Sequence, residues 1–186
     1  TGLNFGAMYN PSSIVDDGYQ FDFFQGGGLD IAYLGFAQID ESGNVNSSRF
    51  GNALTGCGGF IDISQNAKKV VFCGSFAVKS EQEITKNGIN VLHPGKFNKF
   101  IKQVEQVTFS SEYALENNQK VLYVTERAVF QLTKKGLLLK EIATGIDLQK
   151  DVLAMMDFTP IIDTKLKSFD ATIFKNEKLN LLLQEA

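Results

Sequence analysis

The chain has 186 residues, 44% of them hydrophobic, and a formal net charge of −3. This length and composition allow a buried core, with one domain as the default expectation. Lys and Arg are dispersed, which argues against a nucleic-acid partner, and no apolar run approaches the roughly 18 residues of a membrane span.

The cysteines and the single histidine restrict metal and redox chemistry. Cys57 and Cys73 form no Cys-x-x-Cys pattern and His93 is the one histidine, so we expect no metal site. Unpaired thiols in an acidic chain without a signal-peptide pattern favour the reducing cytoplasm. Because the chain opens on Thr1 rather than Met, we expect it to be a piece of a longer polypeptide or a cleavage product.

The first part of the chain predicts one short helix and one buried strand. An Asn-Pro pair at 10–11 is a helix-start signal, and this helix should end before Gly18. Residues 19–24 are aromatic and are expected to pack under a sheet. Residues 29–39 form a nearly continuous apolar run, typical of a strand covered on both faces in a parallel α/β sheet.

The rest of the chain is rich in strand patterns. An Asn-Gly pair at 87–88 between alternating residues is a strong hairpin signal, and Asp147 can cap a helix with one apolar face. The expected segments are strands at 67–76, 100–109 and 119–126, hairpins at 83–92 and 128–142, and a helix at 148–156. The pattern predicts a β-rich α/β fold with a mixed sheet and several antiparallel hairpins.

A glycine-rich loop within residues 50–63 is the first functional candidate. Gly56, Gly58 and Gly59 lie within four residues, just before a short apolar run. Backbone N–H groups in such a loop can receive negative charge, as in an oxyanion hole or a phosphate cradle. The alternative is a tight turn that needs glycine for steric reasons, and the local sequence favours it because short glycine motifs often match by accident.

Other candidates for chemistry are few. His93 precedes Pro94 and Gly95 in an expected turn, so we interpret it as a surface residue rather than a catalytic base. Glu126 and Arg127 follow a predicted strand, where they could meet a ligand crevice, but a salt bridge explains them equally well. Residue chemistry alone therefore predicts an α/β domain with a glycine loop, and no function.

Six segments, taken together, are more specific than the glycine loop alone. They stand in one order along the chain, at 26–35, 43–46, 56–62, 67–72, 124–130 and 141–147. In this order they resemble the family I CoA-transferases over about residues 2–163. Within that family the sequence is most similar to the single-chain acetate/propionate/acetoacetate type.

The resemblance implies a three-layer α/β/α domain of the CoA-transferase type. Residues 1–163 would be its C-terminal part, and 164–186 a tail that is either a docking helix or a frayed end. It implies no permanently bound cofactor, since coenzyme A is a substrate, and a role in short-chain fatty acid or ketone body metabolism. The implied partners are an acyl-CoA, a short-chain carboxylate, the N-terminal part of the same enzyme and further copies of it, without nucleic acid or membrane.

The resemblance also implies a mechanism. A glutamate carboxylate attacks the acyl-CoA thioester and forms a mixed anhydride. The anhydride becomes a glutamyl-CoA thioester, from which a second carboxylate takes the CoA. Each step passes through an oxyanion that needs backbone N–H donors. By resemblance these donors are those of Gly59 and Phe60, and Gly56, Gly58 and Gly59 contact CoA.

One departure from the family pattern limits the prediction. The family's glutamate lies in a Glu-x-Gly motif before the segment that is Gly2–Gly6 here, and this chain begins at Thr1. We therefore expect the chain alone to be inactive. Alternatives are an acyl-CoA hydrolase on the same fold, a non-catalytic module that binds CoA or a partner protein, and a sugar-phosphate isomerase-like module.

Overall fold

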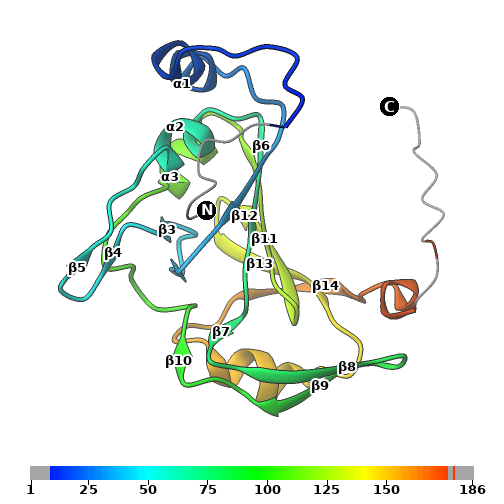
Figure 1. Cartoon of the computed structure of the whole chain (residues 1–186). Helices are drawn as coiled ribbons and strands as arrows, with labels where there is room; N and C mark the ends of the chain where they lie inside the picture. The colour runs from blue at the N-terminus through cyan, green and yellow to red at the C-terminus, as the bar shows by residue number, and fades with distance from the viewer. Residues whose placement is uncertain (1–8, 176–177, 179–186) are drawn as a thin grey trace.

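The computed structural model describes residues 9–175 and 178, and its centre is a six-stranded mixed sheet (Figure 1). The first three strands in the sheet order are parallel, the fourth is antiparallel to both of its neighbours, and the sixth is parallel to the fifth. In sheet order the strands are β1 (Ala32–Gly35), β6 (Lys69–Cys73), β11 (Lys120–Val124), β12 (Ala128–Thr133), β13 (Gly136–Ile142) and β14 (Ile161–Ser168). The predicted α/β class with a mixed sheet is confirmed.

Short ribbons and helices surround this sheet. The ribbons are β2 (Gln38–Ile39) with β3 (Val45–Asn46), β4 (Arg49–Phe50) with β5 (Ala53–Leu54), β7 (Ala77–Val78) with β10 (Phe97–Asn98), and β8 (Glu81–Thr85) with β9 (Gly88–His93). The helices are α1 (Asp17–Gln25), α2 (Phe60–Gln65), α3 (Ser111–Glu116), η2 (Leu148–Val152), η3 (Leu153–Met155) and η4 (Ala171–Phe174). Both predicted hairpins are confirmed, as β8–β9 and as β12–β13.

Aromatic rings fill the buried face of the sheet. Phe72 of β6 is fully buried, with its ring centre 4.9 Å from that of Phe109 and 5.6 Å from that of Tyr123. Phe60 of α2 stacks on the same ring, and Ala114 of α3 belongs to the same core. The helices α2 and α3 therefore cover this face.

The opposite face of the sheet is open in the part of the chain that the structure describes. One row of register partners crosses it, consisting of Tyr33, Val71, Leu122, Gln131 and Leu138. Tyr33 is 66% exposed and Leu122 is 37% exposed. The prediction that the strand within 29–39 is covered on both faces is therefore wrong at Tyr33 in the described part of the chain.

The predicted helix ending before Gly18 is also wrong, because the helix begins where that prediction placed its end. The Asp16 side chain accepts a hydrogen bond from the Gly18 N–H at 3.1 Å and caps α1. Residues 19–24 lie on α1 and not under the sheet, with Tyr19 72% and Phe23 58% exposed. α1 instead packs beside α2.

The apolar run 29–39 and the segment 100–109 are more irregular than predicted. The run divides into β1 and β2, and 101–108 is not a strand. Phe100 and Phe109 are both fully buried and form single bridges to Ile39 and Val45. The alternating segment 100–109 is thus a loop whose two ends are held by the buried rings of Phe100 and Phe109.

The C-terminal elements agree in part with the sequence. The predicted helix at 148–156 is present as the irregular turns η2 and η3, with the Asp147 carboxylate accepting from the Lys150 N–H at 2.8 Å. The expected boundary at 163 falls inside β14, so 164–168 belong to the sheet. Residues 176–177 and 179–186 of the expected tail, and the Gly2–Gly6 segment, lie outside the described residues. No described helix combines the length and apolar character that crossing a bilayer requires.

Candidate functional site

The glycine loop leads from β5 into α2 and brings the predicted site residues together. Gly56 and Gly58 have φ of +79° and +51°, a region that residues with a Cβ rarely adopt. Gly59 has an ordinary φ of −82°, but a Cβ there would lie 2.5 Å from the Phe21 ring. Gly56 and Gly58 are thus required by their backbone conformation, and Gly59 because a side chain there would clash with Phe21.

Hydrogen bonding in this loop separates the two predicted oxyanion donors. The Phe60 N–H donates to the Cys57 carbonyl at 3.0 Å, whereas the N–H groups of Gly58 and Gly59 have no acceptor among the described residues. Neither residue has a side chain that could cover these donors. The loop therefore presents unpaired backbone donors at Gly58 and Gly59, while that of Phe60 is occupied.

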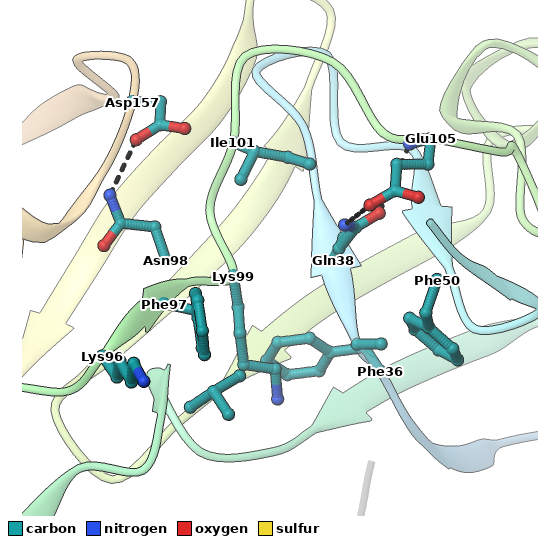
Figure 2. Close-up of a pocket in the computed structure, with 12 residues that line it drawn as sticks. Phe36, Gln38, Phe50, Lys96, Phe97, Asn98, Lys99, Ile101, Glu105 and Asp157 are labelled. Atoms are coloured by element: carbon teal, nitrogen blue, oxygen red, sulfur yellow. Dashed lines mark hydrogen bonds between the residues drawn. The ribbon is translucent and has the colours of Figure 1, made fainter. Parts of the chain in front are cut away.

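A cavity of about 760 Å³ lies at the carboxyl ends of the parallel strands (Figure 2). Phe36 directly follows β1, and Gly74, which follows β6, is beside the Lys99 ammonium. Phe50 of the β4–β5 ribbon also lines the cavity, and this ribbon continues into the glycine loop. No glycine of that loop lines the cavity. The carboxyl end of parallel strands is where ligands bind in open α/β sheets.

Lys99 is the functional candidate that sequence reasoning missed. Its side chain is buried, with Nζ 4.1 Å from the centre of the Phe36 ring. Burial lowers the pKa of this ammonium, and the charge of Glu126 acts in the opposite direction. In the sequence Lys96, Lys99 and Lys102 recur every third residue, and nothing in that pattern distinguishes the buried one.

Glu126 and Arg127 form a structural contact. Arg127 is fully buried, and its guanidinium donates to the carbonyls of Asp151 and Pro94 at 3.0 and 2.7 Å. Its Nε lies 3.4 Å from Glu126 Oε1, and Glu126 Oε2 accepts from the Phe76 N–H at 2.9 Å. Of the two interpretations, the ion pair is the one that the geometry supports.

Asn46 fixes the ribbon between the cavity and the loop. It is fully buried, and its amide donates to the Gln38 side chain and to the Arg49 carbonyl, both at 2.6 Å. Its oxygen accepts from the N–H groups of Ser48 and Arg49. A buried amide with partners on both ends holds its surroundings in one arrangement.

The remaining candidate shows no catalytic environment. His93 is exposed on β9, with Nε2 3.9 Å from Glu81 Oε2, as expected of a surface residue. Within 9–175 and 178, no three His, Cys, Asp or Glu side chains come together in a way that could hold a metal ion.

The relatives named from the sequence comparison are CoA-transferases. The chain is 51% identical over 179 residues to a caffeate CoA-transferase of Acetobacterium woodii, covering 94% of this chain and 34% of that protein. It is 47% identical over 186 residues to the acetate CoA-transferase YdiF of Escherichia coli K12, covering 100% of this chain and 35% of the relative. No family model matches the chain.

Solved structures agree with the sequence relatives. The fold matches the crystal structure of the YdiF acyl-CoA transferase apoenzyme from Escherichia coli O157:H7 with a TM-score of 0.93 and 46% identity, covering 100% of this chain and 36% of that one. A structure of that enzyme as a thioester complex with CoA matches with a TM-score of 0.93 and 46% identity, covering 97% and 35%. The chain thus spans about a third of the length of the relatives it matches.

Proposed function

The chain belongs with the CoA-transferases by sequence and by fold, and we propose that it supplies the oxyanion-binding loop of such an enzyme. The enzyme moves CoA between a short-chain acyl-CoA and a carboxylate. The nucleophilic glutamate and the rest of the substrate cleft come from polypeptide outside this chain.

The observation that carries the proposal is the arrangement of residues 56–59. The loop has the glycine motif of the resemblance, and the N–H groups of Gly58 and Gly59 are without acceptors among the described residues. An oxyanion that forms beside the loop would be bound by these fixed donors, at no cost of reorganisation during the reaction. The Phe60 N–H can join only after it leaves the Cys57 carbonyl.

The chemistry proceeds in balanced steps. The glutamate carboxylate adds to the thioester carbonyl, and the carbonyl oxygen takes the negative charge that the loop binds. Collapse breaks the C–S bond and releases CoA thiolate and an acyl-glutamyl anhydride. The thiolate then attacks the glutamyl carbonyl and releases the first carboxylate, leaving a glutamyl-CoA thioester. A second carboxylate then reverses these steps and leaves as the new acyl-CoA. Covalent catalysis thus divides one difficult exchange into easier steps.

The test is a CoA-exchange assay with acetoacetyl-CoA and acetate, on this chain and on a chain extended upstream to the length of its relatives. We expect turnover only from the extended chain, together with a glutamyl thioester that borohydride reduces. Exchange by this chain alone would contradict the assignment of the glutamate to another segment.

Two further outcomes would replace the proposal. Free CoA formed without an added carboxylate would indicate an acyl-CoA hydrolase. A folded, extended protein that binds CoA but neither exchanges it nor forms the thioester would be a binding module.

We also propose that the enzyme is cytoplasmic and oligomeric. Cys57 and Cys73 are both unpaired and exposed, which fits a reducing compartment. The open apolar face of the sheet fits a chain that is covered by further polypeptide.

A further inference from the structure

Lys99 has no direct ion-pair partner among the described residues, although the charge of Glu126 acts on it from a distance. Its side chain is only 7% exposed, and Nζ has no hydrogen-bond acceptor and no carboxylate at salt-bridge distance in the part of the chain that the structure describes. Its contact is the face of the Phe36 ring, 4.1 Å away. A largely desolvated ammonium without a paired anion is costly, and a ring face only partly replaces an anion.

The carboxylates around the cavity already have other partners. Glu126 accepts from a backbone N–H and lies beside Arg127. Glu105 accepts from an amide side chain at 2.8 Å, and Asp157 from another at 2.7 Å. In Figure 2 these two acids lie in the upper corners of the view, and the Lys99 amino group points away from both. The ammonium is therefore free to pair with an incoming anion.

The walls of the cavity are about half apolar and half polar. Phe36 and Phe97 lie on either side of the Lys99 stem in Figure 2, and Phe50, Val78 and Ile101 line the cavity as well. Its volume of about 760 Å³ lies within the range of small-molecule sites. Two cations, the exposed Lys96 and the buried Lys99, face the aromatic rings, and Lys99 is the one buried against an aromatic face.

We propose that this cavity binds an organic acid, with its carboxylate on the Lys99 ammonium and its apolar body against Phe36 and Phe97. The choice of a carboxylate over another anion rests on the proposed transfer of CoA to carboxylates, and the inference adds which residues receive the acid. Charge favours this choice, because the two lining acids already oppose an anion and a carboxylate brings one negative charge where a phosphate brings up to two. The lining holds the exposed Lys96 and the buried Lys99 as cations, and Glu105 and Asp157 as acids.

Direct binding tests the proposal independently of turnover. The complete protein is titrated with 3-phenylpropanoate by calorimetry, without CoA, and inorganic phosphate is tested as a competitor. We expect 3-phenylpropanoate to bind and phosphate not to compete. Lys99→Met should weaken binding of the acid at least about tenfold, the size expected for a lost charged hydrogen bond. Lys102→Met is the matched control, since Lys102 is exposed three residues away and outside the cavity, and it should leave binding within twofold.

A thermal melt separates a binding role from a structural one. If Lys99 serves ligand binding, Lys99→Met removes a buried, unpaired charge and Tm stays the same or rises. If Lys99 holds the fold together, Tm of Lys99→Met falls. The weaker acid binding would then follow from the loss of stability, which would overturn the proposal. Lys99→Gln replaces Lys99→Met if that variant does not fold.

The remaining outcomes are also decisive. Binding of 3-phenylpropanoate that is unchanged in Lys99→Met, or displaced by phosphate, overturns the inference. Acid binding that depends on Lys99 in a protein that never exchanges CoA supports the inference and contradicts the proposed function. CoA exchange without Lys99-dependent acid binding supports the proposed function and contradicts the inference.

Discussion

The ring of Phe21 lies 2.5 Å from the point where a Cβ on Gly59 would stand. Gly59→Ala must therefore displace either this ring or the loop that carries the proposed oxyanion donor. We expect the CoA-exchange rate of the extended protein to fall about 10²–10³-fold, the usual effect of losing one such donor. The free energy of unfolding should fall by about 1–3 kcal/mol from overpacking.

Two further variants check the cause. Gly59→Ala combined with Phe21→Ala makes room for the new methyl group and should recover part of the rate. Gly35→Ala, where a Cβ meets nothing within 4 Å, should leave both rate and stability unchanged. An unaltered rate in Gly59→Ala alone would remove the loop from the proposed mechanism.

Tyr123 should make the free energy of unfolding fall as the pH rises in the alkaline range. It is fully buried, its hydroxyl donates to the Gly43 carbonyl at 2.5 Å, and burial together with the charge of Asp40 raises its pKa well above the usual value. The unfolded phenol ionises near pH 10, so this stabilisation is complete below about pH 10 and is lost as pH rises toward the folded pKa.

Urea denaturation at a series of pH values measures this effect. We expect the unfolding free energy to decline more steeply above about pH 10 in the unmodified chain than in Tyr123→Phe. Tyr123→Phe should itself cost about 1 kcal/mol at neutral pH for the lost hydrogen bond. Tyr33→Phe, at a residue that is 66% exposed, should keep the steep decline, and equal slopes in all three would contradict the assignment.

Arg127 should be among the most sensitive positions for stability. Its replacement by Met leaves the carbonyls of Asp151 and Pro94 without a donor and Glu126 without its cation. Breaking such a buried pair typically costs about 3–5 kcal/mol. Lys140→Met, at a more exposed pair with Asp163, should cost under about 1 kcal/mol. Chemical denaturation of the two variants should show this difference, and similar losses would mean that Arg127 is not paired as described.

The open sheet face should make this chain associate when it is expressed by itself. Leu122 is 37% exposed at the centre of a row of mostly apolar side chains that crosses the sheet, and an exposed apolar patch of this kind tends to be buried. Sedimentation should show oligomers whose population falls in Leu122→Lys. Glu83→Lys, which changes an exposed charge on the β8–β9 hairpin, should not reduce association.

The sequence predicted the parts of the fold that depend on local patterns. The Asn87-Gly88 pair and the strands at 128–133 and 136–142 form hairpins as expected, because turn chemistry and alternation act over a few residues. The Asp147 cap is present for the same reason. The loop of Gly56, Gly58 and Gly59 is visible in the sequence as a cluster of glycines. Its proposed role in binding an oxyanion comes from the resemblance to a family.

The failures arise where burial depends on distant segments. Residues 19–24 are as aromatic as a core strand, yet they form the exposed helix α1. Phe100 and Phe109 alternate with polar neighbours, yet each is anchored separately to the β2–β3 region. Lys99 is buried because Gly74 and Phe36 close over it from two strand ends, and no sequence pattern records that contact.

The sheet order has a consequence for the way the molecule assembles. β11, β12 and β13 are consecutive along the chain and pair through short turns, so their contacts close small loops and form quickly. β1 and β6 enter the sheet through much longer connections, so they should dock later. The Lys99 cavity requires the ends of both, and its ligand would therefore recognise only chains that have completed this late step, shifting the folding equilibrium toward them by mass action.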